Sequence, residues 1–235
     1  MSVPIFVIHC KTGLEQRRES IRSQFQKNKL SFEFVLDFDR DEIPLSIAEK
    51  YFSANYPSSL MSVCLKHRIA TQKLVESGAS HALIFEDDVI FLKNFENDLK
   101  EILNEATAIQ GDYVVYLSNY GNRYTPRSRL KKGQKLYQNN HSRACDSYLL
   151  SLGAAKKRLQ WWENQKYSLP IDHQFNVIDS SQGIQIFWAE DPISEQGSDN
   201  GTFVSCIEKK HNRILKKVRW NLDKFYKKHI LRNLR

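Results

Sequence analysis

Short apolar runs alternate with stretches of helical spacing along most of the chain. Apolar runs and period-two alternation predict strands at 4–9, 31–38, 81–85, 113–118, 146–151 and 184–189. Apolar residues three and four positions apart predict helices at 14–25, 45–52, 60–78, 95–106 and 153–163. Strands that alternate with helices in this way are typical of a mainly parallel α/β sheet with helices on its faces.

Two stretches depart from this pattern. Residues 119–143 are polar and contain Gly121, Pro126 and Gly133, so we expect a long excursion at the rim of the sheet. Residues 190–203 are rich in turn-forming residues and predict a loop. There is no internal repeat and no low-complexity linker. The 235 residues are enough for one α/β domain with a core of its own, or for two small domains.

The segment HALIFEDDVIF at 81–91 places Glu86, Asp87 and Asp88 directly after an apolar strand. Burying an unpaired charge is costly, but ligands in open α/β sheets bind at the carboxyl ends of strands. Carboxylate oxygens are the ligands that Mg²⁺ and Mn²⁺ prefer. In an extended segment Glu86 and Asp88 would point one way and Asp87 the other, which places two oxygen donors beside one cation. The alternative is a solvated loop in which one acid caps the next element.

Charge changes the picture at the C-terminus. The chain has a formal net charge of +8, yet residues 209–235 hold 11 Lys and Arg and a single acid, Asp223. The other 208 residues hold 24 basic and 26 acidic side chains. We therefore expect a near-neutral domain at 1–208 and a basic tail at 209–235. Within the tail, apolar residues recur on one side of a predicted helix, at Leu215, Val218, Leu222, Phe225 and Tyr226.

A basic amphipathic helix is typical of an anchor on an anionic membrane surface. The alternatives are a patch for nucleic acid and a helix that packs on the domain with a solvated basic side. The body of the chain lacks a basic and aromatic surface motif, so we expect no nucleic-acid partner. We find no signal peptide and no run approaching the roughly 18 apolar residues of a membrane span. The four scattered cysteines, without a CxxC pair, predict reduced thiols in a cytosolic protein.

The segment SVCLKHRIATQKLVESGASHALIFEDDVIF at 62–91 resembles the central signature of glycosyltransferase family 25. That family includes bacterial lipooligosaccharide galactosyl- and glucosyltransferases and the collagen galactosyltransferases. Other similar pieces follow in the family's order over about residues 4–207, namely VIHCKTGLEQRRESI, DSYLLSLGAAKKRL, PIDHQF and EQGSDNGTFVSCI. One departure lies in SVCLKH, where His67 matches but Lys66 stands at the family's serine position.

The resemblance implies a GT-A fold and transfer of a sugar, with inversion, from a nucleotide donor. The acidic triplet would serve as the family's version of the DxD motif. Asp88 is then expected to bind Mn²⁺ or Mg²⁺, Glu86 to contact the metal or the donor ribose, and Asp87 to belong to the donor site. His173 is a third candidate metal ligand, although a lone histidine beside Asp172 is more often a structural hydrogen-bonding group.

Direct inversion also needs a general base that deprotonates the acceptor hydroxyl. Asp172 in PIDHQF is the first candidate, with a helix cap or an acceptor-binding group as the alternative for this residue. Glu190 and Asp191 are rival candidates, because they too follow a predicted strand.

Five further residues are candidates for the donor site. Arg17 and Arg18 lie in the first turns of the first predicted helix, where a diphosphate would be favoured. The alternative for each arginine is a surface ion pair with a neighbouring glutamate. His9 begins HCKTG, a turn whose backbone could lie against the uracil. Gln196 and Ser198 lie in the segment that resembles the family's C-terminal loop.

These implications predict an inverting, metal-dependent glycosyltransferase that moves galactose from UDP-galactose to a lipooligosaccharide acceptor, with UDP-glucose as the rival donor. Its partners would be the nucleotide sugar, a lipid-linked oligosaccharide and, through residues 209–235, an anionic membrane surface. Its expected location is the cytoplasm, on the inner face of a bacterial inner membrane. Two other classes are alternatives: a binding protein that uses the tail on nucleic acid or membrane, and a metal-dependent phosphohydrolase.

Overall fold

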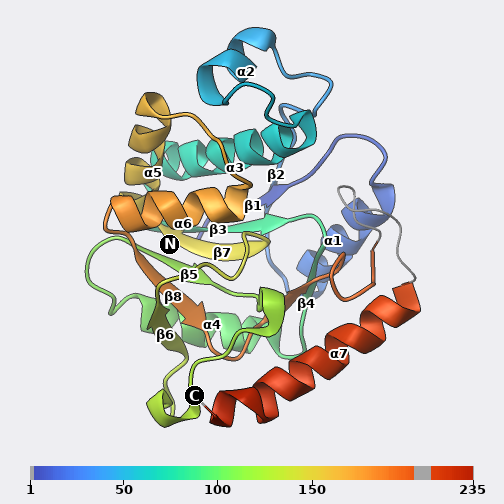
Figure 1. Cartoon of the computed structure of the whole chain (residues 1–235), viewed down its shortest axis with the longest axis vertical. Helices are drawn as coiled ribbons and strands as arrows, with labels where there is room; N and C mark the ends of the chain where they lie inside the picture. Colours follow the sequence, from blue (N-terminus) through green and yellow to red (C-terminus); the bar gives the residue numbers. More distant parts are fainter. Residues whose placement is uncertain (1–2, 204–212, 235) are drawn as a thin grey trace.

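A seven-stranded mixed sheet forms the centre of the computed structural model, which describes residues 3–203 and 213–234 (Figure 1). The strands lie in the order β2 (Glu33–Val35), β1 (Ile5–Ile8), β3 (His81–Glu86), β7 (Ser147–Ser151), β5 (Tyr113–Tyr116), β8 (Gln185–Ala189) and β6 (Leu136–Asn139). Strands β2, β1, β3, β5 and β8 run in one direction, and β7 and β6 run in the other. The mixed and mainly parallel sheet that the sequence predicted is confirmed.

Helices cover both faces of this sheet (Figure 1). On one face lie α2 (Leu45–Tyr51), α3 (Ser58–Ser77), α5 (Leu152–Asn164) and α6 (Ile171–Ser181), and on the other α1 (Glu15–Lys27) and α4 (Phe95–Ala106). Strand β3 serves both cores, because Ile84 packs into the first and Leu83 and Phe85 into the second. A strand buried on both sides gives a continuous apolar run, which is how β3 was recognised.

One buried ion pair joins α5 to α6. Arg158 donates from Nε at 2.8 Å and from Nη2 at 2.6 Å to the two oxygens of Asp179, and neither side chain is accessible to solvent. The guanidinium also lies 3.8 Å from the centre of the Phe175 ring. This contact fixes α6, whose first turn carries Asp172.

Two short strands form a separate antiparallel ribbon. In it β4 (Val89–Phe91) pairs with β9 (Ser194–Gln196), with Val89 opposite Gln196. A two-stranded ribbon is marginal by itself, but here Val89 is buried and Phe91 stacks on Phe95 of α4 with ring centres 3.7 Å apart. The ribbon brings the acidic segment after β3 beside the loop that follows β9.

At the C-terminus, α7 (Arg213–His229) and the short 3-10 turn η3 (Leu231–Asn233) run along one side of the domain (Figure 1). A helix therefore lies within the basic tail where the sequence predicted one. The expected boundary between 208 and 209 lies outside the described residues, so the division of the chain into two parts stays a prediction. No described helix combines the length and the apolar content needed to cross a bilayer.

The polar segment 119–143 is more structured than the excursion we expected. It contains the 3-10 turns η1 (Tyr120–Asn122) and η2 (Arg127–Arg129), followed by β6, which pairs with β8 at the edge of the sheet. The segment does lie at the rim of the sheet, as expected, but the sequence did not predict strand β6 within it. An edge strand has only one strand neighbour, and β6 buries just Leu136 and Tyr137, so its apolar signal is weak.

Candidate active site

The three acidic residues lie at the end of β3. Glu86 is the last residue of β3, Asp87 and Asp88 form a turn, and Val89 begins β4. The alternation of side chains that we expected across the triplet is wrong, because the extended backbone ends at Glu86. Arg17 instead approaches both aspartates, while Glu86 points to a different set of partners.

Asp87 is buried, and two basic side chains surround it. Its Oδ2 is 2.7 Å from His9 Nδ1, and its Oδ1 accepts a hydrogen bond from Arg17 Nη1 at 2.7 Å. His9 follows β1 and Arg17 comes from α1, so this carboxylate joins three parts of the chain. These contacts give Asp87 a structural role in holding the turn. The donor contacts expected for Asp87, His9 and Arg17 stay predictions.

Asp88 is buried with much less compensation. Its side chain is 4% accessible, Arg17 Nη1 stays 3.9 Å from Oδ2, and Ser198 supplies a hydrogen bond. Within the described parts of the chain, the buried Oδ1 has no hydrogen-bond partner. Burial first, and then the charge of Glu86, raise the pKa of Asp88 to about 7. A divalent cation at Oδ1 would offset this cost, so the side chain fits the expected Mn²⁺ or Mg²⁺.

The loop after β9 holds the backbone of Asp88. Gly197 donates its N–H to Asp88 O at 2.7 Å, and a Cβ at Gly197 would lie 2.6 Å from that oxygen and 2.5 Å from the Phe203 ring. A side chain at position 197 would therefore push the two segments apart. Ser198, which the resemblance placed in the donor loop, lies against Asp88, and Gln196 lies in β9.

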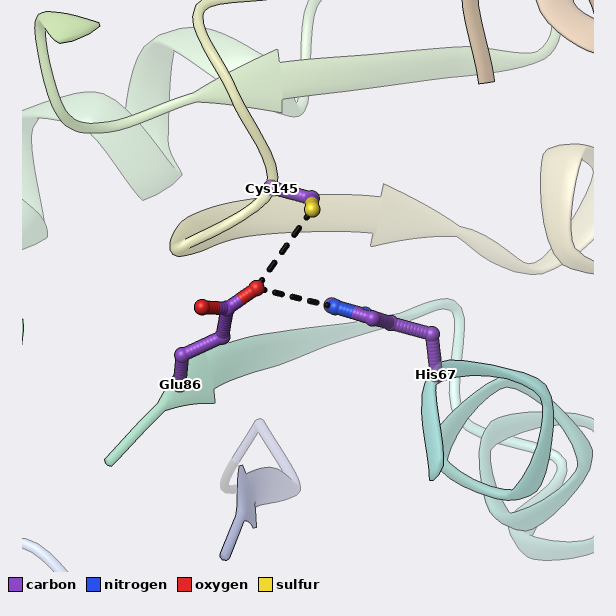
Figure 2. A group of neighbouring side chains, drawn as sticks. All are labelled: His67, Glu86 and Cys145. Atoms are coloured by element: carbon purple, nitrogen blue, oxygen red, sulfur yellow. Dashed lines mark hydrogen bonds and ion pairs between the residues drawn. The ribbon is translucent and has the colours of Figure 1, made fainter. Parts of the chain in front are cut away.

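Glu86 is oriented by two buried side chains (Figure 2). Its Oε1 lies 3.3 Å from His67 Nε2 and accepts a hydrogen bond from Cys145 Sγ at 3.4 Å. His67 Nδ1 lies 2.9 Å from the Tyr148 hydroxyl, so both ring nitrogens are engaged. Burial raises the pKa of the Cys145 thiol, which keeps it a donor to the carboxylate. The ligand atoms of His67, Glu86 and Cys145 lie within 4.8 Å of one another, a spacing that could also hold an ion.

Sequence reasoning missed Asp146, a fourth carboxylate near the turn. Its Oδ1 accepts a hydrogen bond from Ser118 Oγ at 2.5 Å, and its backbone oxygen accepts the Glu86 N–H at 2.8 Å. Burial raises the pKa of Asp146 well above its usual range, and Glu86 and Asp88 add to the effect. The signal for this residue was topological: β7 runs against β3, so the start of β7 meets the end of β3.

Asp172 lies in the first turn of α6, near the same corner. Its side chain is 31% accessible. Burial is the main cause of the raised pKa of Cys64 and of Cys145, and the negative charges of Asp172 and Glu86 raise it further. The residue at the N-cap position is Pro170, and no side chain caps this helix. The helix-cap alternative for Asp172 is therefore wrong, and its carboxylate faces partly open space at the edge that holds Glu86.

His173, the third expected metal ligand, follows Asp172 on the outer side of α6. Its side chain is 68% accessible, and its Nε2 lies 4.0 Å from Asp172 Oδ2. No described contact joins His173 to Asp88. Its metal role therefore stays a prediction that the geometry does not strengthen.

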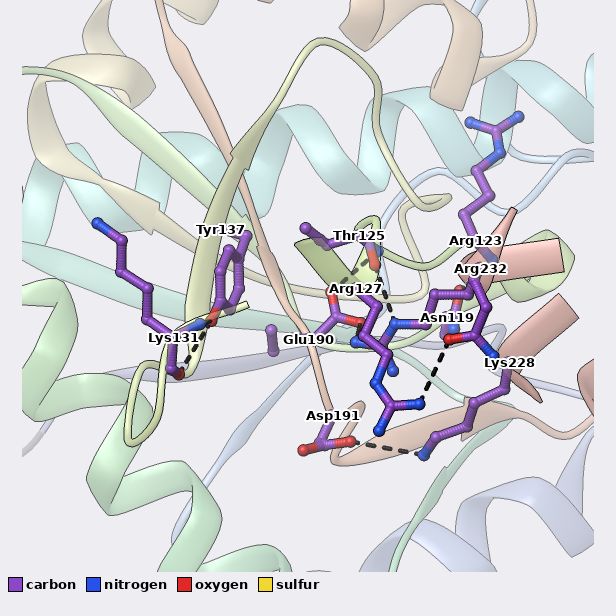
Figure 3. A network of polar contacts seen from close by, with 12 residues as sticks. Asn119, Arg123, Thr125, Arg127, Lys131, Tyr137, Glu190, Asp191, Lys228 and Arg232 are labelled. Carbon is purple, nitrogen blue, oxygen red and sulfur yellow. Dashed lines mark hydrogen bonds and ion pairs between the residues drawn. The ribbon is translucent and has the colours of Figure 1, made fainter. Parts of the chain in front are cut away.

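Glu190 and Asp191, the rival candidate bases, lie in a different network (Figure 3). Glu190 Oε2 accepts the Thr125 N–H at 3.1 Å, and Glu190 Oε1 accepts a hydrogen bond from Arg232 Nη2 at 2.6 Å. Asp191 lies 3.5 Å from Lys228 Nζ. Strands β7 and β5 separate β8 from β3 in the sheet. These contacts argue against both residues as the base, because Glu190 faces Thr125 and η3, and Asp191 faces α7.

Two basic residues near the first strands have structural partners. The Arg18 guanidinium lies 5.5 Å from the centre of the Phe34 ring, and its donor contact stays a prediction. Lys66, at the position that departs from the family, is buried, and its Nζ donates to Leu36 O and Asp37 O at 2.8 Å each. These two hydrogen bonds hold the segment after β2 in place. They explain why a lysine occupies position 66 in this chain.

We predict that the raised pKa of Asp88 makes the metal-free protein less stable as the pH rises. An acid whose pKa is higher in the folded state stabilises the fold fully below its unfolded pKa of about 4. That contribution is lost as the pH rises through about 7, the value in the folded protein. The difference in thermal midpoint between the wild type and Asp88→Asn, measured in EDTA from pH 5 to pH 8, should shift steadily in favour of the variant. A constant difference over this range would contradict the prediction.

The family assignment rests on a sequence model for "Glycosyltransferase family 25 (LPS biosynthesis protein)", which matches residues 2–175. The chain belongs to this family, and its mixed sheet flanked by helices is the GT-A-like fold that the resemblance predicted. The match includes β3, the acidic turn, Cys145 and Asp172. No curated protein matches the chain.

The solved structures to which this chain is similar include three glycosyltransferases. A glycosyltransferase that acts in glycosylation of the major capsid of PBCV-1 aligns over 93% of this chain and 99% of its own, with a TM-score of 0.46 and 8% identity. A mutant Drosophila β1,4-galactosyltransferase 7, in complex with manganese, UDP-Gal and xylobiose, aligns over 92% and 79%, with a TM-score of 0.44 and 12% identity. Mouse xyloside xylosyltransferase 1 aligns over 78% and 84%, with a TM-score of 0.41 and 12% identity.

Proposed function

We propose that this family 25 glycosyltransferase is an inverting, metal-dependent enzyme that transfers galactose from UDP-galactose to a lipooligosaccharide acceptor. UDP-glucose is the rival donor, since nothing described distinguishes the two hexoses. The observation that carries the proposal is Asp88, a buried carboxylate with an oxygen that no described group satisfies, beside Glu86 and at the end of a central strand. In a glycosyltransferase, that is a place for a metal and a nucleotide diphosphate.

The proposed metal ligands are Asp88 and, on the metal or the donor ribose, Glu86. A bound Mn²⁺ or Mg²⁺ would stabilise the charge that develops on the leaving nucleoside diphosphate. The chain itself supplies the geometry: His67 and Cys145 fix Oε1 of Glu86, and the Glu86 side chain as a whole is 21% accessible. Arg17, held by Asp87, adds a fixed positive charge 3.9 Å from Asp88.

Asp172 is the proposed general base. An acceptor hydroxyl would give its proton to the Asp172 carboxylate while its oxygen forms a bond to the anomeric carbon. The bond from that carbon to the diphosphate breaks on the opposite side, which inverts the configuration. The position of Asp172 supports this role, because the carboxylate is partly accessible and lies within electrostatic range of the thiol that contacts Glu86.

The proposed acceptor is a lipid-linked oligosaccharide at the cytoplasmic face of a bacterial inner membrane. The family description names LPS biosynthesis, a process whose intermediates are carried on lipid. The basic tail supports a peripheral location, since lysine and arginine side chains are attracted to anionic headgroups.

The direct test of class, donor and metal is a thermal-shift screen of nucleotide sugars with and without Mn²⁺, followed by detection of the product. We expect a UDP-hexose to raise the thermal midpoint only when Mn²⁺ is present, and sugar to reach a truncated lipooligosaccharide. Release of phosphate without sugar transfer would instead identify a phosphohydrolase. Salt-dependent binding of DNA with no response to UDP-sugars would identify the binding-protein alternative.

Asp172→Asn is expected to keep donor binding and to lower transfer by about 10²–10⁴-fold, the usual contribution of a general base. Equilibrium binding of UDP with Mn²⁺ and the initial rate of transfer provide the two measurements. Asp98→Asn is the matched control, because Asp98 also lies in the first turn of a helix and its side chain is 36% accessible. Normal transfer by Asp172→Asn would remove this residue from the mechanism.

A further inference from the structure

Helix α7 contacts the domain through its charged side. Asn122 donates to Asp223 at 2.8 Å, and Lys227 donates to the Gly121 carbonyl at 2.9 Å. The other inward pairs are Lys224 with Glu195, Lys228 with Asp191 and Arg232 with Glu190. An amphipathic helix of a globular domain normally turns its apolar side inward. Here the polar side is inward, so the apolar side is left on the surface.

The apolar side of α7 and η3 is accordingly exposed. The accessible fractions lie between 46% and 76% for Val218, Leu222, Phe225, Ile230 and Leu234, which we call the apolar stripe. Among the described residues outside α7 and η3, large apolar residues this open are scattered singly, as at Leu45. Scattered exposed residues need no explanation, but a contiguous stripe indicates an interaction surface.

A basic segment lies at the C-terminal end of the stripe. Residues 127–132 read RSRLKK and contain no acid. They contact η3, and Arg127 Nη1 lies 3.5 Å from Asn233 Oδ1. The side chains of Arg129, Lys131 and Lys132 are exposed. This segment, far from α7 in sequence, therefore adds positive charge beside the exposed apolar residues.

We propose that the apolar stripe, together with the basic segment 127–132, is a composite surface that docks on an anionic lipid bilayer. Apolar side chains flanked by lysine and arginine match the acyl boundary and the headgroups of such a bilayer. A second copy of the chain fits less well, because pairing the stripes would bring two basic helices together. Nucleic acid would match the charge but leave the apolar stripe in water.

This inference rests on the proposed function and adds to it, because it identifies the part of the protein that would bind the membrane in which the lipid-linked acceptor lies. Lys224 and Lys228 of α7 pair with Glu195 and Asp191, and Arg232 of η3 pairs with Glu190. These three acids lie in β9 or in the segment just before it. Strand β9 continues into the loop whose Gly197 binds the Asp88 backbone. Docking through this surface would thus set the distance between the bilayer and the acidic turn.

The test is co-sedimentation of the full chain with phosphatidylcholine vesicles, with and without phosphatidylglycerol. We expect the wild type to bind only the anionic vesicles. Leu222→Ser/Phe225→Ser should weaken that binding at least tenfold, and Arg129→Gln/Lys131→Gln/Lys132→Gln should weaken it measurably. Leu45→Ser is the matched control, because Leu45 is 73% accessible and Leu222 is 66% accessible, and it should bind as the wild type does.

Circular dichroism and UDP binding show whether each variant is folded. Wild-type binding by the Leu222→Ser/Phe225→Ser variant would overturn the proposal, and so would failure of the wild type to bind anionic vesicles. Duplex DNA binding that equals vesicle binding, and that survives loss of the stripe, would assign the surface to nucleic acid and also overturn it. Vesicle binding needs no sugar transfer. If the protein transferred no sugar, the vesicle experiment would therefore still test the membrane-docking proposal by itself.

Discussion

Asp88→Asn is expected to lower the rate of sugar transfer by at least about 10³-fold, because the several kcal/mol that a bound metal contributes to the transition state would be lost. The fold should survive, since asparagine has the same shape and removes a poorly compensated buried charge. The measurements are kcat/KM with UDP-galactose and Mn²⁺, and Mn²⁺ affinity followed through the electron paramagnetic resonance signal of the free ion.

Two comparisons make the Asp88 experiment specific. Asp98→Asn serves again as the control, because Asp98 lies on α4 and its described ion pair is with Lys135. Glu86→Gln should reduce transfer as well. If Glu86 is a metal ligand, the variant should bind Mn²⁺ more weakly; if Glu86 contacts the donor ribose, its Mn²⁺ affinity should be unchanged. If Asp88→Asn retains both Mn²⁺ affinity and transfer, the metal site does not lie at this turn.

The largest expected loss of stability follows from Asp179→Asn. Removing one partner of a buried ion pair leaves the other charge uncompensated, which costs about 3–5 kcal/mol. In a domain of this size each kcal/mol lowers the thermal midpoint by about 2–4 °C, so we expect a fall on the order of 10 °C. The charge left behind would be the guanidinium of Arg158, which has no access to water. Thermal and urea unfolding provide the measurement.

Replacing both partners is the informative companion experiment. Arg158→Met/Asp179→Leu should recover most of the lost stability, because apolar groups of similar volume often replace a buried pair without cost. Glu96→Gln is the exposed control: its i,i+4 pair with Lys100 is open to solvent, and we expect a thermal midpoint close to that of the wild type. A small effect of Asp179→Asn would mean that water reaches Arg158 in the variant.

Transfer should also fall in Asp179→Asn, although no described hydrogen bond or ion pair joins Arg158 or Asp179 to the candidate carboxylates Glu86, Asp88 and Asp172. The pair fastens α6 to α5, and α6 positions Asp172. A loss of transfer that tracks the loss of folded protein would be structural. A larger loss at a temperature where the protein is fully folded would show that the position of α6 matters for the reaction.

Much of the fold could be predicted from local pattern. Strand β3 and its acidic end were identifiable because a strand buried on both faces gives an unbroken apolar run. Helix α3 was identifiable from its spacing and from Gly78, which adopts a left-handed conformation at the helix end. Edge strand β6 was not identifiable, because only half of it is buried and its sequence resembles a polar loop.

The composition of the site was harder to predict, because it depends on contacts distant in sequence. Asp146 was missed since its place beside Glu86 follows from the reversed direction of β7. Glu190 was a candidate base because it follows a strand, but its partners come from Thr125 and Arg232. The protein compensates for the charge of Asp87 with Arg17 and leaves Asp88 largely uncompensated, a distinction that no spacing rule supplies.

The β4–β9 ribbon has a consequence for how the protein is made. It pairs Val89 with Gln196, residues about 100 positions apart, and the turn that bears Asp88 is complete only when this ribbon forms. Contacts of such long sequence separation tend to form late in folding. During synthesis the acidic triplet leaves the ribosome long before β9 does. After the acidic triplet is made, about 100 further residues must therefore be synthesised before the segment that holds Asp88 in place exists.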